Sequence, residues 1–117
     1  MGSRNTRPIS WIRAARRDFE KFPAAVQETV VDALTVAAEG AKADIAKPLH
    51  GLGSGVFEVV VQYRTDAFRS VYAVQLEDSI WVVHAFQKKS TQGGKTPKKE
   101  IDLIRERLKR IKKELNR

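Results

Sequence analysis

The sequence predicts a single α+β domain, in which a helical hairpin packs on a small twisted antiparallel sheet and a basic helix follows. Two stretches between residues 13 and 39 space their apolar residues as helices do. Three β-branched runs between residues 56 and 86 are joined by very short turns, and positive charge gathers after residue 87. With 117 residues, 42% of them hydrophobic and 31% charged, the chain is long enough for one genuine core.

The helical hairpin is predicted on either side of Pro23. In residues 13–22 the apolar side chains recur at spacings of four and three, at Ala15, Phe19 and Phe22. Pro23 cannot continue that helix, but it suits the first turn of the next one. The second helix is predicted over residues 24–39, with Gly40 as its C-cap and an apolar stripe made of Val26, Val30, Leu34 and Ala37.

The sheet is predicted as an antiparallel meander of three strands, over residues 56–64, 68–76 and 80–86. The segments between them are too short for a crossover, so neighbouring strands must form hairpins. Residues 8–12 are expected to add a short strand at the sheet edge. Residues 41–55 contain Pro48 and three glycines, and we expect a connection without regular structure there.

Strand alternation predicts which side chains share a face of this sheet. The helical stripe is expected to pack on Val59, Val61 and Tyr63, which share one face of the first strand. In the third strand, strict alternation places His84 and Phe86 on the same face as Ile80 and Val82.

The last helix is predicted over residues 97–115, because Thr96 and Pro97 supply an N-cap and a first helical residue. Between Lys88 and Arg117 lie twelve Lys or Arg residues and only four Asp or Glu residues. The net charge of the whole chain is also +8, so the remainder is balanced. This asymmetry indicates a polyanionic partner. Residues 1–7 are expected to be flexible.

Composition argues against several classes of protein. The chain has no cysteine and two histidines, which excludes disulfides and a thiolate nucleophile, and we expect neither a metal site nor a small-molecule cofactor. No segment approaches the roughly 18 apolar residues that span a bilayer, and no apolar leader segment is apparent. We therefore expect a cytoplasmic protein with no membrane partner.

Several charged residues have a structural explanation as well as a functional one. Arg64 is explained as a solvated hairpin residue, and Arg69 as a cross-strand partner of Glu58. His84, in an apolar strand, is explained as a hydrogen-bonded core histidine, and the basic residues after it as protection of a sheet edge.

The order of five short motifs along residues 8–113 is distinctive. They are KPLHGL at 47–52, FE at 57–58, FRSVY at 68–72, HAFQKKS at 84–90, and TP at 96–97 before a helix with Arg105 and Arg107. This order resembles the phage-derived HigB-like proteins of the RelE/ParE toxin superfamily. The resemblance implies a RelE-like fold and the toxin of a type II toxin–antitoxin system. It also implies a metal-independent endoribonuclease that cleaves mRNA on the ribosome and so inhibits translation.

The resemblance also suggests site residues. In RelE a catalytic arginine stands five residues before an Arg-x-x-Tyr strand motif, and Arg64 stands five before Arg69. A basic residue just after the last strand matches Lys89, with Lys88 beside it. We therefore take Arg64, Lys88, Lys89 and His84 as catalytic candidates. The candidates for RNA binding are Lys47, Arg69, Lys95, Lys98, Lys99 and Arg105.

Two alternatives stay open, because Glu58-Val59-Val60 lacks the arginine of the Glu-apolar-Arg motif of many HigB toxins, and residues 105–117 hold no tyrosine. One alternative is a ParE-like toxin that acts on gyrase. The other is a non-catalytic phage relic that binds nucleic acid. For the toxin, the implied partners are mRNA, the ribosome with its rRNA, and a HigA-like antitoxin with a helix-turn-helix domain. An acidic or amphipathic segment of that antitoxin is expected to cover the open sheet face or the basic helix.

Overall fold

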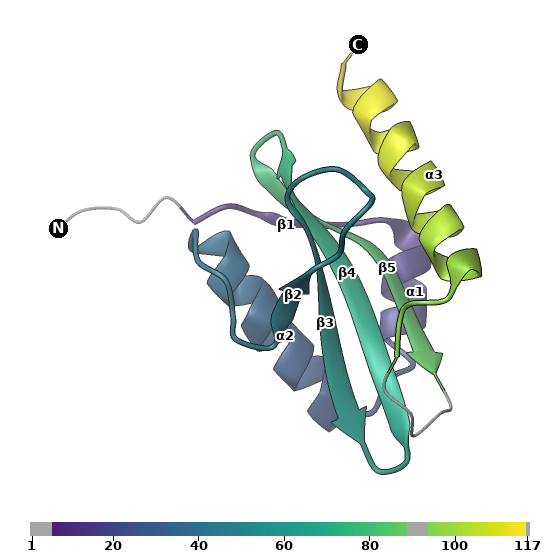
Figure 1. Ribbon diagram of the computed structural model, residues 1–117. Coiled ribbons are helices and arrows are strands. Elements are labelled where there is room, and N and C mark those ends of the chain that lie inside the picture. Colours follow the sequence, from purple (N-terminus) through teal and green to yellow (C-terminus); the bar gives the residue numbers. More distant parts are fainter. Residues whose placement is uncertain (1–5, 89–93, 117) are drawn as a thin grey trace, which may run out of the picture.

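The computed structural model, which describes residues 6–88 and 94–116, is a five-stranded sheet with helices on both faces (Figure 1). The strand order is β1-β5-β4-β3-β2. The strands are β1 (Ile9–Trp11), β2 (Ala46–Pro48), β3 (Val56–Tyr63), β4 (Asp66–Leu76) and β5 (Ser79–Lys88). The helices are α1 (Arg13–Phe19), α2 (Ala24–Ala38) and α3 (Lys98–Leu115). The predicted α+β class is confirmed.

The predicted meander is present, since β3, β4 and β5 pair antiparallel in sequence order. Two further strands complete the sheet. β1 lies at the predicted edge, and it pairs with β5 in parallel. β2 falls inside the segment predicted to lack regular structure, and it pairs antiparallel with the start of β3. That prediction was wrong because a three-residue strand ending in Pro48 has no alternation of its own and is held by its partner strand.

Helices α1 and α2 cover one face of the sheet and enclose the larger core. Val26, Val30 and Leu34 are buried in one cluster with Val59, against which Val61 and Tyr63 pack, as predicted. Each such side chain contributes roughly 1.5–3 kcal/mol by leaving water. The ring of Phe22 meets that of Phe68, with centroids 4.9 Å apart, so the chain between the two helices is also tied to the sheet.

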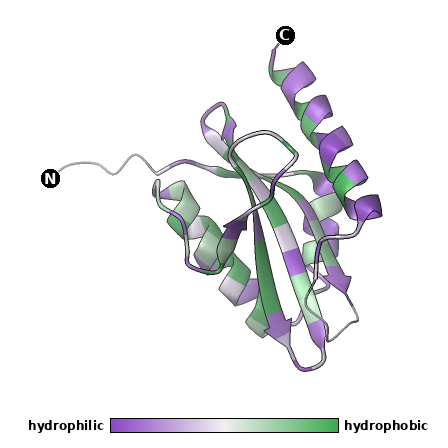
Figure 2. Ribbon diagram, in the orientation of Figure 1, coloured by the Kyte–Doolittle hydropathy of each residue, from purple (hydrophilic) through white to green (hydrophobic). Residues whose placement is uncertain are grey.

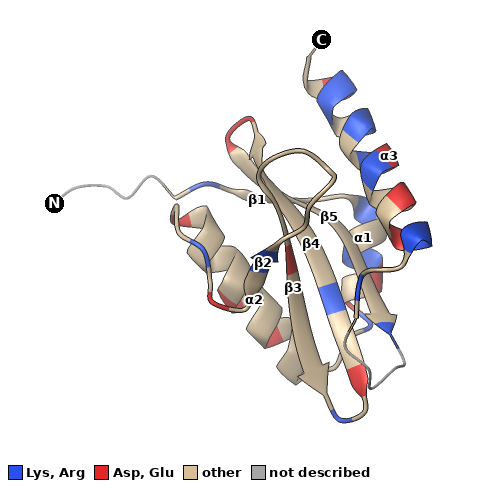
Figure 3. Cartoon of the chain, viewed as in Figure 1, with Lys and Arg blue, Asp and Glu red and all other residues tan. Residues whose placement is uncertain are grey.

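Helix α3 packs on the opposite face, over β4 and β5. Its residues Ile104, Leu108 and Ile111 are buried against a smaller cluster that includes Val71 and Val83. The other sides of α3 are hydrophilic, whereas the strands are mostly hydrophobic (Figure 2). Lys and Arg are dense along α3 and sparse on the sheet (Figure 3). Among the described helices none is both long and apolar enough to cross a membrane.

A bulge in β5 corrects the predicted facing of His84. Val71 pairs with His84, but the next residue, Tyr72, pairs with Val82, so Val83 is an extra residue. Such an insertion places two successive side chains on the same face. As a result Val83 and His84 both face α3, whereas Ile80 and Val82 lie in the core under α1 and α2. The prediction that His84 shares a face with Ile80 and Val82 was therefore wrong.

Arg7 holds the N-terminal segment against the end of β4 and the turn that follows it. The guanidinium of Arg7 donates hydrogen bonds to the backbone carbonyls of Val74, Glu77, Asp78 and Ser79, at 2.6–3.2 Å. The prediction that residues 1–7 are flexible was therefore wrong for Arg7, and residues 1–5 lie outside the described part of the chain.

Candidate nucleic-acid interface

On the face of the sheet that α3 only partly covers, three of the cross-strand rows contain the predicted site residues. Directly paired residues share a face. The registers of β3 with β4 and of β4 with β5 define the rows as Glu58, Val71 and His84; then Val60, Arg69 and Phe86; then Gln62, Ala67 and Lys88. The first row lies under α3, and the third lies at the end of the sheet that holds the β3–β4 turn.

The third row and the adjoining turn bring two of the predicted catalytic residues to one end of the sheet. Arg64 is exposed in the turn, with its guanidinium 5.4 Å from the centre of the Tyr63 ring. Lys88 is half-buried in the last position of β5, opposite Ala67. Two strand spacings, about 10 Å, separate β3 from β5. Lys89 follows directly but lies outside the described residues.

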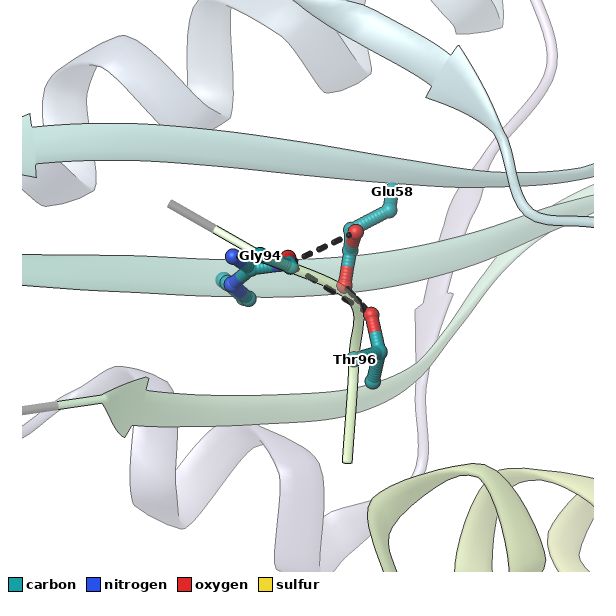
Figure 4. Close-up of polar contacts among 4 residues, drawn as sticks. Glu58, Gly94 and Thr96 are labelled. Atoms are coloured by element: carbon teal, nitrogen blue, oxygen red, sulfur yellow. Dashed lines mark hydrogen bonds and ion pairs between the residues drawn. The ribbon is translucent and has the colours of Figure 1, made fainter. Parts of the chain in front are cut away.

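The second row holds Arg69, which is 4% exposed and is held through both terminal nitrogens of its guanidinium. Its Nη1 donates to Glu58 Oε1 at 3.2 Å, and its Nη2 donates to the Gly94 carbonyl at 2.8 Å. The Thr96 hydroxyl donates to the other oxygen of Glu58 at 2.6 Å. Figure 4 shows Glu58, Gly94 and Thr96 meeting where the segment before α3 crosses the sheet. This network ties that segment to β3 and β4.

His84 is fixed from both ring nitrogens by α3. Its Nδ1 lies 3.1 Å from Nη1 of Arg107, which always donates, so Nδ1 accepts. Nε2 then carries the proton and donates to Glu100 Oε1 at 2.6 Å. Burial lowers the pKa of His84 below its usual 6.5, although the hydrogen bond that His84 donates to Glu100 acts in the opposite direction. The imidazole is therefore neutral at pH 7.

The remaining residues predicted to bind RNA are spread around the start of α3 and the far edge of the sheet. Lys47, Lys95 and Lys99 are exposed. Lys98 and Arg105 both pair with Asp102, at 2.9 and 3.2 Å, and the hydrogen bond from Lys98 lowers the pKa of that carboxyl. Lys47 pairs with Glu58 in the β2–β3 register, so it extends the first row at the edge opposite β5.

Sequence reasoning missed the residues that hold this face together. Glu100, Arg107 and Thr96 are the partners of His84 and Arg69, and none was proposed as a site residue. Glu100 and Arg107 lie two turns apart, on the side of α3 that meets the sheet, and this spacing was the available signal. Among residues 6–88 and 94–116, no three His, Asp or Glu side chains converge as a metal site would require.

An exposed guanidinium and an ammonium at one end of a sheet can bind phosphate oxygens, and the guanidinium can do so through two parallel hydrogen bonds. The half-buried ring of Phe86 lies one row away from Lys88, with one side against the His84 ring at a centroid distance of 5.1 Å. Cations next to an aromatic surface are the usual elements of a single-stranded nucleic-acid interface.

Comparison with known proteins shows the family to which this sequence belongs. Residues 17–109 match the family described as phage-derived protein Gp49-like (DUF891). No curated protein matches the chain. Among solved structures, a double mutant of the E. coli toxin RelE in the free state is similar, with a TM-score of 0.61 and 20% identity over 91% of this chain and 98% of that one.

Two further structures share the fold. One is the isolated E. coli RelE toxin, with a TM-score of 0.56 and 19% identity over 90% of this chain and 98% of RelE. The other is the toxin–antitoxin complex RelBE2 from Mycobacterium tuberculosis, with a TM-score of 0.50 and 19% identity over 77% of this chain and 100% of the matched one. The family model covers most of the sequence, so this chain belongs to the phage-derived Gp49-like family, and it has the fold of the RelE toxins.

Proposed function

We propose that this protein is the toxin of a type II toxin–antitoxin pair and that it cleaves mRNA on the ribosome. The observation that carries the proposal is the pair of accessible cations, Arg64 and Lys88, at one end of the sheet. The buried cation of the sheet, Arg69, is instead paired with Glu58. The similar solved proteins are described as toxins, and one is bound to an antitoxin. They support the toxin role through fold alone.

In the proposed reaction, a ribose 2′-OH loses its proton and attacks the adjacent phosphate, and the bond between phosphorus and the 5′-oxygen breaks. The 5′-oxygen takes a proton from an acid or from water, so the products are a 2′,3′-cyclic phosphate and a 5′-hydroxyl. Negative charge grows on the phosphate oxygens in the transition state, and Arg64 with Lys88 and Lys89 would stabilise it. The RNA backbone would approach along Lys95, Lys98, Lys99 and Arg105, which precede or open α3, with Lys47 on the opposite edge.

Arg69 and His84 already have hydrogen-bond partners within the protein, which limits the roles that they can take. Arg69 is already paired with Glu58, so we assign it to positioning the face rather than to direct contact with phosphate. His84 is the neutral imidazole of this face, and it would accept the 2′-OH proton only after Nδ1 exchanged its bond from Arg107. This engagement is the observation that favours a non-nuclease toxin, such as a ParE-like poison of gyrase, as the second candidate.

Expression of the wild-type chain with a reporter mRNA decides between the two. For a nuclease we expect growth arrest, with primer-extension stops on the reporter that disappear when its start codon is removed. Intact mRNA together with broken DNA would contradict the nuclease and support the gyrase-directed candidate. Growth without arrest would contradict both.

We further propose that a separate HigA-like antitoxin with an acidic or amphipathic segment neutralises the protein by covering the cationic end or α3. The net charge of +8 would steer such a segment, so association is expected to be fast and sensitive to salt. Co-expression with the adjacent open reading frame should restore growth. A neighbouring protein that neither binds nor rescues would contradict the pairing.

A further inference from the structure

We propose that Phe86 is a stacking surface for one base of the RNA strand whose phosphates meet Lys88 and Arg64. The proposal rests on the RNA-directed function above and adds a residue that positions the substrate. It starts from the place of Phe86 in the second row, opposite Arg69 and two residues before Lys88 along β5. Residues two apart in a strand point to the same face, so the ring and the ammonium share that face.

The ring is held in place before any ligand arrives. It lies nearly parallel to the His84 imidazole, at a centroid distance of 5.1 Å and an interplanar angle of 25°. His84 is itself held at both nitrogens by Glu100 and Arg107. A flat ring fixed in this way loses little conformational entropy when a base stacks on it, and that favours binding.

The space beside Phe86 suits a base. A cavity of about 350 Å³ opens at the edge of β5 and is lined by Phe86, His84, Gln87, Lys21, Phe22 and Glu100 among others. That volume is at the lower end of the range of small-ligand sites, roughly 300–1,000 Å³. Its wall combines aromatic rings with an amide, an ammonium and the two carboxylates of Asp18 and Glu100, groups that can hydrogen-bond to the edge of a base.

The surroundings of Phe86 differ from those of the other stacked ring pair. Phe57 stacks on Tyr72 at 5.5 Å and 24°, but it lies against the α1–α2 core, on the other face of the sheet. Both phenylalanines are half-buried. Phe57 therefore provides a matched control for the loss of a stacked aromatic ring away from the cationic face.

The test measures binding of the full-length protein to a fluorescein-labelled single-stranded RNA heptamer across a salt series. Replacing Phe86 by Leu should weaken binding about 5- to 150-fold, the range for one stacked base. The salt slope should stay as in wild type, since no phosphate contact is lost. Lys88→Ala should instead reduce the slope by about 0.7. Phe57→Leu and Phe86→Tyr should bind like wild type.

Abasic nucleotides show whether the loss reflects stacking or a general disturbance of the fold. In a double-mutant cycle, one abasic position in the heptamer should weaken wild-type binding and leave Phe86→Leu binding almost unchanged. Equal affinities of Phe86→Leu and wild type would overturn the proposal. It would also be overturned if Phe86→Leu weakened binding by the same factor for the intact heptamer and for every abasic heptamer. Wild-type protein that does not bind the RNA would overturn this inference, whereas the proposed cleavage on the ribosome is decided separately by the reporter mRNA experiment above.

Discussion

The middle of the sheet and its end at the β3–β4 turn use positive charge in opposite ways. In the middle, Arg69 is buried and paired with Glu58. At the end, Arg64 is exposed and Lys88 is half-buried, and neither has an ion pair with any described residue. A buried cation must be neutralised where it lies, whereas an exposed one is free to meet a ligand. The middle therefore holds the segment before α3, and the end is where we propose that the substrate binds.

The largest effect is expected from breaking the buried pair. Replacing Glu58 by Ala leaves the Arg69 guanidinium buried without its carboxylate and also removes the acceptor of the Thr96 hydroxyl. We expect the free energy of unfolding to fall by about 3–5 kcal/mol. Urea denaturation followed by circular dichroism measures the change.

A double variant is the control for that prediction. Glu58→Leu combined with Arg69→Met removes both charges and preserves most of the volume, so its loss of stability should be much smaller than that of Glu58→Ala. If the double variant were as unstable as Glu58→Ala, the hydrogen bonds to the segment at Gly94 and Thr96 would carry the stability, and the ion pair would not.

A smaller effect is expected from pH. Burial holds the pKa of His84 below 6.5, so the unfolded chain binds more protons than the folded chain just below that pH. The contribution of neutral His84 to stability should therefore be complete above pH 6.5 and decrease as the pH falls toward the folded pKa. His84→Gln should lose this dependence, whereas substitution of the exposed His50 by Gln should retain it. Thermal unfolding between pH 5 and 7.5 would test the difference.

The smallest effect on stability concerns the two tight turns of the meander. Arg64 and Glu77 have positive φ angles, of 60° and 56°, a conformation that costs non-glycine residues roughly 1–2 kcal/mol. Glycine recovers this cost but loses more chain entropy, about 0.5–1 kcal/mol. Arg64→Gly and Glu77→Gly should each leave the protein as stable as wild type or up to about 1.5 kcal/mol more stable.

Much of the fold was predictable because its signals are local. Three β-rich runs with two very short turns allow little besides a meander, and Pro23 separates the two helices as predicted. Arg64 and Lys88 were not predicted to lie at one end of the sheet, and the observed pairing of β3, β4 and β5 places them there. Strand β2 and the bulge at Val83 were not predictable, because both depend on a partner strand rather than on the segment itself.

The pair of Arg69 with Glu58 was anticipated from strand pairing, but the other partners of the site residues were beyond local reasoning. Arg69 meets Gly94 and Thr96, more than 20 residues away, and His84 meets Glu100 and Arg107 across the same interface. The sequence shows that these residues are polar and lie near helix α3, but only the packing of α3 on the sheet decides which of them touch. The alternation of residues along the strand did not show whether Arg69 is buried or exposed.

The two turn variants also give the decisive measurement of function. Both relieve the same backbone conformation, but only Arg64→Gly removes a cation from the proposed site. In primer extension on a reporter mRNA, Arg64→Gly should reduce the cleavage rate by about 10²-fold or more, the usual loss when one group that stabilises transition-state charge is removed. Glu77→Gly should cleave as wild type does. Wild-type cleavage by a folded Arg64→Gly protein would contradict the assignment of this end of the sheet as the site of RNA cleavage.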